Sequence, residues 1–353
     1  MSMTKRNRIL SLLGTAITIG LLSGCGETEK TDLDNGLASV TLQEYDDALD
    51  FLKQAEQNEE DLESVYRAEG LAYMGLRDYA NAADSFKKAL SYAGTKTGEA
   101  EKDINYYLAL CYAKQDDYEA AIERLDAVSA LDPSDETAAL ERGKLKLYMN
   151  DKAGAKEDFD LAAGADKGHA GVYIDIYDVY SSKGLEKDGA EYLEAARTAD
   201  PEKMDDYDKA RLCYYTYDLE GACHYLEYAR SIGKADSDMI RLLGHCYREL
   251  DKYENATAIY LGYLEDHAEP EICNELGISY AEEGDYTKAL DAFRMGINMP
   301  EDNTCMQELK RNEIVCLENL KNYKEAAELA SVYITQYGED PDMVKELAFL
   351  STR

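Results

Sequence analysis

The feature that most constrains this chain is a pattern that returns about every 34 residues. The segment LGHCYRELDKYENATAIY, from Leu243 to Tyr260, comes back as LGISYAEEGDYTKALDAF, from Leu276 to Phe293, with Gly, Tyr, Tyr and Ala in register. Such a period is typical of repeat proteins, in which each unit packs only against its neighbours. Nine units can be aligned, 33 to 39 residues apart, on the small or apolar anchors Gly36, Gly70, Ala109, Gly143, Tyr177, Ala210, Gly244, Gly277 and Ile314.

Each unit carries a small residue soon after its turn and, in most units, a large one four positions later. A small side chain lets two helix axes approach closely, and the large residue on the same helical face fills the space beside it. The small residues are Ala82, Ala121, Ala155, Ala256, Ala289 and Ala326, and the large ones are Phe86, Leu125, Phe159, Tyr260 and Phe293. All five prolines fall between predicted units, where helix ends tolerate them. The pattern therefore predicts pairs of packed helices.

This pattern resembles the tetratricopeptide repeat (TPR), a pair of antiparallel helices with Gly or Ala and Tyr on the first helix and Tyr, Ala, Phe and Ala on the second. The match is clearest in the units of Gly70, Ala109, Gly244 and Gly277, whereas Lys146 stands where the first helix of its unit would carry Tyr. The resemblance implies an all-α fold: a right-handed superhelical solenoid of about nine helix-turn-helix repeats over residues 33–353. The amphipathic segment Pro341–Leu350 is then the C-terminal capping helix.

The N-terminus has the layout of an export signal. Lys5, Arg6 and Arg8 precede an apolar run from Ile9 to Leu22, which is too short to span a bilayer stably. The run ends in LSGC, which resembles a bacterial lipobox with Cys25 as the lipidated residue. We expect a lipoprotein signal peptide at 1–24, a lipidated cysteine and tether at 25–32, and an extracytoplasmic protein anchored to the bacterial cell membrane by its N-terminal lipid alone. The alternative is a plain secretory signal that is cut elsewhere.

Charge and residue inventory exclude several classes of function. The net charge of −34, from 72 acidic and 38 basic residues, excludes a nucleic-acid partner, because phosphates require a basic face. No HExxH, GxSxG, phosphate-binding or dinucleotide-binding motif occurs, the four histidines are scattered, and acidic pairs such as Asp116 and Asp117 fall in turns, where acids cap the next helix. We therefore expect neither an enzyme nor a cofactor.

Seven cysteines follow Cys25, an odd number for an exported chain. Cys111, Cys246 and Cys316 each lie two residues after an anchor, which predicts that they are small buried apolar residues. The other four share no spacing and no CxxC motif, so no metal site is expected; they are Cys213, Cys223, Cys273 and Cys305.

The remaining feature is an excess of basic residues on one predicted face. The resemblance implies that first helices line a concave groove, and the positions three before and one after each anchor share that face. These positions hold five Arg or Lys but one acid. The predicted groove residues are Arg67, Tyr106, Lys144, Tyr207, Arg211, Tyr214, Arg241, His245, Arg248, Asn274 and Arg311.

Arginine forks suit carboxylates, so the predicted ligand is an acidic peptide or protein segment, or a free C-terminal carboxylate. One alternative is that these cations only form internal ion pairs with neighbouring Asp and Glu. Another is a different class of function, a structural assembly factor for an envelope or secretion complex that acts through its edges or convex face.

Overall fold

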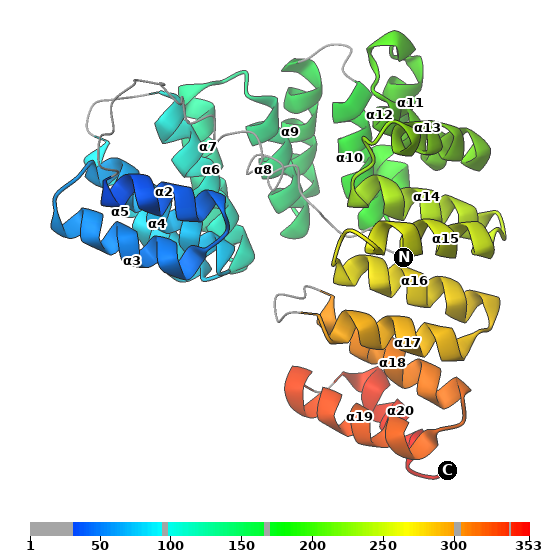
Figure 1. The fold of residues 1–353 in the computed structure, drawn as a ribbon. Coiled ribbons are helices and arrows are strands. Elements are labelled where there is room, and N and C mark those ends of the chain that lie inside the picture. Colours follow the sequence, from blue (N-terminus) through cyan, green and yellow to red (C-terminus); the bar gives the residue numbers. More distant parts are fainter. Residues whose placement is uncertain (1–30, 94–97, 166–169, 300–304, 339) are drawn as a thin grey trace. The chain divides into compact units, whose positions relative to one another are not determined.

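The structure is a computed structural model that describes residues 31–93, 98–165, 170–299, 305–338 and 340–353. Within these ranges all regular secondary structure is helical, and consecutive helices form nine antiparallel-type pairs followed by one more helix (Figure 1). The predicted all-α solenoid is confirmed, including hairpins at the weakly matching units of Ala210 and Ile314. The signal peptide, Cys25, Pro300 and His169 lie outside the described residues.

The described chain divides into two compact units, with the boundary after Tyr192. The helices of the first unit are α2 Asp32–Thr41, α3 Tyr45–Gln57, α4 Leu62–Gly75, α5 Tyr79–Tyr92, α6 Glu99–Lys114, α7 Tyr118–Leu131, α8 Glu136–Tyr148, α9 Lys152–Ala165 and α10 Ala170–Ser182. Helix α11, Glu186–Thr198, contains the boundary. The first helix thus begins one residue before the predicted solenoid.

The second unit continues the same alternation of first and second helices. Its elements are the 3-10 turn η1 Pro201–Lys203 and the helices α12 Asp206–Tyr215, α13 Leu219–Ser231, α14 Ser237–Glu249, α15 Tyr253–Leu264, α16 Pro270–Glu283, α17 Tyr286–Ile297, α18 Met306–Asn319, α19 Tyr323–Tyr337 and α20 Pro341–Leu350. Three prolines stand at the first position of a helix, as expected for a residue without an N–H, and these are Pro201, Pro270 and Pro341.

The turn inside each pair is built from a recurring sequence. After the first helix one residue adopts a left-handed conformation, and in five of the pairs the Asp that follows it caps the second helix. In the second pair Arg77 has φ of 58° and Asp78 accepts a hydrogen bond from the backbone N–H of Asn81. In the third pair Asp116 has φ of 60° and Asp117 accepts from Ala120. The predicted capping role in this turn is confirmed for Asp117.

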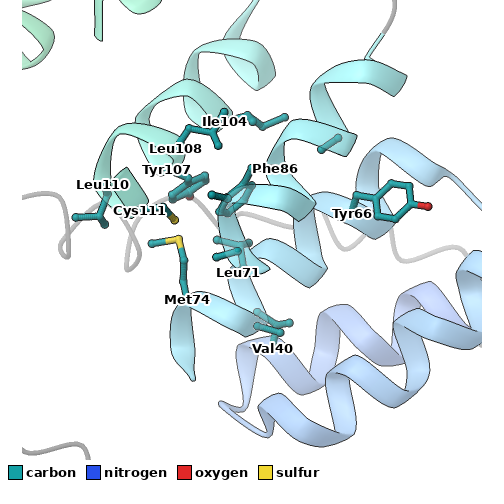
Figure 2. Close-up of a cluster of buried hydrophobic side chains, with 14 of the residues drawn as sticks. Val40, Tyr66, Leu71, Met74, Phe86, Ile104, Tyr107, Leu108, Leu110 and Cys111 are labelled. Carbon is teal, nitrogen blue, oxygen red and sulfur yellow. The ribbon is translucent and has the colours of Figure 1, made fainter. Parts of the chain in front are cut away.

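The anchors are small because an aromatic ring from the second helix lies directly against them. A Cβ added to Gly70 would lie 2.7 Å from Cε1 of Phe86, and one added to Gly143 would lie 2.6 Å from Cε1 of Phe159. Both rings are fully buried, and Phe86 belongs to a cluster that continues into the next pair through Tyr107 and other side chains (Figure 2). On the second helix, the predicted small residue Ala82 and large residue Phe86 are both fully buried, whereas the contact of the ring with the anchor glycine was not predicted.

Lys146, which departs from the repeat pattern, is accommodated by an ion pair. Its Nζ lies 2.8 Å from Oδ2 of Asp158, whose side chain is 5% exposed and also accepts hydrogen bonds from Arg142. Arg142 in turn reaches Asp126 of the preceding pair. A polar network therefore occupies the place that a tyrosine takes in the units of Gly70, Ala109, Tyr177, Gly244 and Gly277.

First helices approach one another more closely than second helices do. In the second unit α12 contacts α14, α14 contacts α16 and α16 contacts α18, and in the first unit α2 contacts α4. No pair of successive second helices among the described residues makes contacts of that extent. In the second unit first helices therefore form one continuous row from α12 to α18. No helix in the described part of the chain combines the length and the apolar character needed to cross a bilayer.

Candidate functional site

Three first helices of the second unit bring most of the predicted groove residues together. Tyr214 of α12 and His245 of α14 are joined by a 2.8 Å hydrogen bond between the phenol oxygen and Nε2. Arg241 and Arg248 stand two turns apart on α14, and both reach the carboxylate of Glu275 on α16. We call Tyr214, Arg241, His245, Arg248 and Glu275 the α14 cluster.

Arg248 holds the cluster together, and each of its three guanidinium nitrogens already donates a hydrogen bond to a carboxylate. Its Nε donates to Glu282 at 2.8 Å, its Nη2 to the other oxygen of Glu282 at 3.0 Å, and its Nη1 to Glu275 at 2.8 Å. Burial disfavours its charge, but the two carboxylates raise its pKa above the ordinary value. Arg248 is thus a permanently charged structural cation.

Arg241 sits in the same carboxylate environment but is poorly satisfied. Its nearest acidic oxygens lie at 3.6 Å on Asp238 and 4.0 Å on Glu275, beyond hydrogen-bond distance. Its Nε is buried and finds no hydrogen-bond partner among the described residues. The side chain is nevertheless 17% exposed, so part of it, though not Nε, reaches the surface. A buried donor without a partner is uncommon in folded proteins and marks this group for attention.

Uncharged rings lie on the same face as Arg241 and its acidic neighbours Asp238 and Glu275. Burial, followed by the nearby Arg248, lowers the pKa of His245, so the imidazole is neutral near pH 7. The hydrogen bond between Nε2 and the Tyr214 hydroxyl governs which ring nitrogen carries the proton. On α12, Arg211 lies 5.5 Å above the ring of Tyr207 and 3.4 Å from Asp208. The face thus alternates aromatic rings with guanidinium groups.

Two further predicted residues lie nearer the C-terminal end of the unit. Asn274 of α16 is buried and its Oδ1 accepts a 2.8 Å hydrogen bond from Nδ2 of Asn312 on α18. Arg311 of α18 pairs at 3.4 Å with Asp340, which caps α20. Arg311 therefore helps to hold the capping helix in place. It is not a member of the α14 cluster and lies on the same row of first helices.

The predicted residues of the first unit form separate pairs and not one cluster. The pairs are Arg67 with Asp103 at 3.1 Å, Tyr106 with Asp135 at 2.6 Å, and Lys144 with Glu141 at 2.6 Å. Burial and then the bond to Asp135 raise the pKa of Tyr106, so it remains a neutral donor. Arg67 resembles Arg241, because its Nε is buried and finds no partner in the described part of the chain.

The sequence interpretation missed the acids that accompany these cations. Asp208 and Asp238 stand three residues before Arg211 and Arg241, a spacing that places both side chains on one helical face. That signal was available in the sequence. Glu275 was not recognisable, because it reaches Arg241 and Arg248 from the next pair. For most of the predicted cations the structure shows the alternative that was left open, internal ion pairing.

The cysteine predictions are tested in the same way. Cys111, Cys246 and Cys316 are all buried, as predicted for small apolar residues. Among the described residues, no group of three or more His, Cys, Asp or Glu side chains converges in a way that could hold a metal ion.

Comparison with known proteins supports the repeat assignment. Residues 67–136 match the family model of the tetratricopeptide repeat. Among solved structures, YrrB, a TPR protein with an unusual peptide-binding site, is 21% identical and covers 53% of this chain and 90% of its own, with a TM-score of 0.40. A TPR protein from Parabacteroides merdae is 15% identical over 80% of this chain and 97% of its own, with a TM-score of 0.49.

MamA is a third similar structure, 22% identical over 47% of this chain and 87% of its own, with a TM-score of 0.40. At such identities and scores no ligand or site residue is carried over from these proteins. The matched repeats and the helix pairs of the structure together support a TPR-type scaffold for protein–protein interaction.

Proposed function

We propose that this chain is a lipid-anchored extracytoplasmic scaffold that binds a peptide or protein segment on the face formed by its first helices. The recognised group is a carboxylate, from an acidic side chain or a free C-terminus, and its receptor is Arg241 in the α14 cluster. We assign no reaction to the protein.

The observation that carries this proposal is the contrast between Arg241 and Arg248. Both guanidinium groups lie on α14 and both face Glu275, but only Arg248 has Nε and both Nη atoms hydrogen-bonded. Arg241 has two long ion contacts and a buried Nε without a partner. A guanidinium binds a carboxylate with two parallel N–H donors, so Arg241 retains the capacity that Arg248 has used.

A carboxylate ligand must overcome the negative charge of the whole chain. The net charge of −34 repels acidic segments at long range, but this repulsion is screened beyond about 10 Å at 0.1 M salt. A guanidinium binds a carboxylate at short range, where hydrogen-bond geometry decides the affinity. We therefore expect a weak salt dependence, unlike that of binding driven by net charge.

The proposal is tested with Arg241→Met. This change removes the guanidinium and keeps much of the apolar volume, and it leaves no buried carboxylate alone because Glu275 still pairs with Arg248 at 2.8 Å. The matched control is Arg230→Met on α13, which removes the same charge from a similar pair three residues away, with Glu227. The Arg230 side chain is 49% exposed and does not belong to the α14 cluster.

The probes are arrays of acidic peptides with a free C-terminus and the same peptides with a C-terminal amide. We expect the wild-type protein to select carboxylate-bearing peptides, and Arg241→Met to weaken the selected ones about ten- to a hundredfold, since hydrogen bonds to charged groups contribute about 1.5–3 kcal/mol. Arg230→Met should bind as the wild type does. Equal losses in both variants, or wild-type protein that shows no preference for carboxylates, would contradict the proposal.

Anchoring at the membrane forms the second part of the proposal. It is supported by the basic start, the short apolar run and LSGC, which lie outside the described residues. A lipid on Cys25 would leave five residues, Gly26 to Lys30, before Thr31, whose side chain caps α2 by accepting from the backbone N–H of Asp34. The scaffold would therefore be held close to the bilayer.

The alternative function, assembly through the outer surface, is favoured by one specific observation. Second helices of the second unit expose large apolar side chains, namely Tyr228, Ile232, Leu261, Met295 and Val332. If this surface carries the interaction, Leu261→Asp together with Val332→Asp abolishes association with the native partner while Arg241→Met leaves it intact. The proposed carboxylate site predicts the reverse.

A further inference from the structure

Two positions of the repeat meet at each interface between neighbouring helix pairs. The first position is on the second helix of a pair, directly after its small residue, such as Ala82. The second position is on the first helix of the next pair, two residues after its anchor, such as Ala109. In the first unit these are Ala83 and Cys111, which share one buried cluster with Phe86 and Met74 (Figure 2). In the second unit Leu290 and Cys316 share another.

The third example contains different side chains at the same two positions. Ile122 of α7 packs against the cluster that contains Leu145 of α8. Three interfaces in the two units thus bring the same two register positions into one packed cluster, whatever side chains occupy them. The register itself, and not the residue type, is what places these positions together.

At the interface between α13 and α14 both positions are cysteines. Cys223 follows Ala222 on α13, and Cys246 lies two residues after Gly244 on α14. Cys246 is fully buried, and Cys223 is 8% exposed. Each thiol shifts the pKa of the other, so the two side chains lie near each other. Their sequence separation corresponds to no cysteine motif, so only the repeat register shows that they face each other.

We propose that Cys223 and Cys246 are a redox-active dithiol that closes into a disulfide between the sixth and seventh helix pairs by exchange with a disulfide-bearing co-substrate. The proposal concerns thiols on a different interface from the carboxylate site, and it stands or falls independently of the proposed function. Export of the protein would place the pair where disulfides persist.

The exchange assigns one role to each sulfur. The Cys223 thiolate attacks one sulfur of the co-substrate disulfide, forms a mixed disulfide and expels the other sulfur as a thiolate. The Cys246 thiol then loses its proton and attacks Sγ of Cys223, and the second co-substrate thiolate leaves. Two protein thiols are oxidised to one disulfide, and one co-substrate disulfide is reduced to two thiols, which take up the two protons.

The electrostatics of the two thiols agree with these roles. The Cys246 thiol and then the Lys252 ammonium lower the pKa of Cys223, against the opposing effect of burial. Cys246 has a raised pKa, because it donates toward Cys223 and is buried. Thiolate character therefore belongs to the less deeply buried of the two cysteines, which is the one assigned the nucleophilic attack.

The neighbouring cysteines lack either a lowered pKa or a thiol partner. Cys213 is also close to Cys246, but burial and the adjacent Asp218 raise its pKa and keep it a thiol. Cys273 places its Sγ 4.0 Å from Sδ of Met299, which cannot form a disulfide.

The test oxidises the full-length protein, purified under reducing conditions, with glutathione disulfide. Thiols that remain are then alkylated in denaturant, and peptides are mapped by mass spectrometry without reduction. We expect a cross-linked peptide that joins Cys223 to Cys246, with the loss of two hydrogen atoms and full reversal by dithiothreitol. Cys111 and Cys316, at the same register position as Cys246, should be fully alkylated because Ala83 and Leu290 face them.

The Cys246→Ala variant should stop at a mixed disulfide of Cys223 with glutathione. Ala83→Cys tests the register on its own, since it should create a second link, to Cys111, under the same treatment. The proposal is overturned if wild-type Cys223 and Cys246 both remain alkylatable, if Cys223 keeps its glutathione while Cys246 is intact, or if the link joins Cys246 to Cys213. A link in Ala83→Cys without one in the wild type would support the register and refute the native pair.

Discussion

Gly70 and Gly262 predict opposite outcomes for the same substitution, glycine to alanine inside a helix. A Cβ on Gly70 would lie 2.7 Å from Cε1 of Phe86 and 2.8 Å from Cδ1 and Cζ, closer than carbon atoms normally approach. A Cβ on Gly262, in α15, would meet nothing within 4 Å. Both changes gain about 1 kcal/mol of helix propensity, so the difference between them isolates the packing penalty.

The ring of Phe86 cannot easily move away from the added methyl group. It is fully buried, and its other side stacks on Tyr107 of the next pair with the centroids 5.1 Å apart. Overpacking of a filled core costs about 1–3 kcal/mol. We therefore expect Gly262→Ala to stabilise its helix by up to about 1 kcal/mol. Gly70→Ala should come out about 1–3 kcal/mol less stable than that control.

The third helix pair, α6 with α7, shows how the packing penalty can be removed. Its anchor is Ala109, and the second-helix residue that corresponds to Phe86 is Leu125, which lies in the same buried cluster. The double variant Gly70→Ala with Phe86→Leu reproduces that pairing. We expect it to be more stable than the sum of the two single changes predicts, which a double-mutant cycle measures directly.

The appropriate measurement is native-state hydrogen exchange of the full-length protein, because a repeat array can lose stability locally without a single global transition. Protection should fall in α4, α5 and the adjacent helices for Gly70→Ala, and rise in α15 for Gly262→Ala. If Gly70→Ala instead raises protection as the control does, or if Phe86→Leu adds to its damage, the close-contact explanation of the anchors is wrong.

Two further predictions concern acid stability and anchoring. Burial raises the pKa of Asp135, but Lys102, Tyr106 and the backbone N–H of Ala138 outweigh it and hold that pKa below its ordinary value. Its contribution to the free energy of unfolding is therefore complete above the unfolded pKa, near 3.9, and is lost as the pH falls through the lower folded pKa. The variant Asp135→Asn, which can still cap α8, should reduce this loss of stability below about pH 4 in urea unfolding. An unchanged pH profile would contradict the prediction. Cys25→Ala should move the protein from the detergent-extracted membrane fraction to a soluble or unprocessed form, and a variant that fractionates and migrates as the wild type would disprove lipidation.

Features with a local cause were predictable from residue order. A helix pair needs a small residue opposite a large one at a fixed spacing, and Gly70 with Phe86 satisfies that requirement inside one unit. Capping by Asp117 and burial of Cys111 follow from the same frame. Even Lys146, which breaks the pattern, was identified as a departure, although its partner Asp158 was not.

What the residue order determined by itself is the period, and with it the helix pairs, their anchors and the positions that face a neighbour. What only the tertiary structure decided is which side chains satisfy one another across that interface. Glu275 and Glu282 engage Arg248 at hydrogen-bond distance while Glu275 lies 4.0 Å from Arg241, and these contacts join residues from different pairs. Hydrogen-bond geometry changes over a few tenths of an ångström, whereas a period fixes position only to a helical turn.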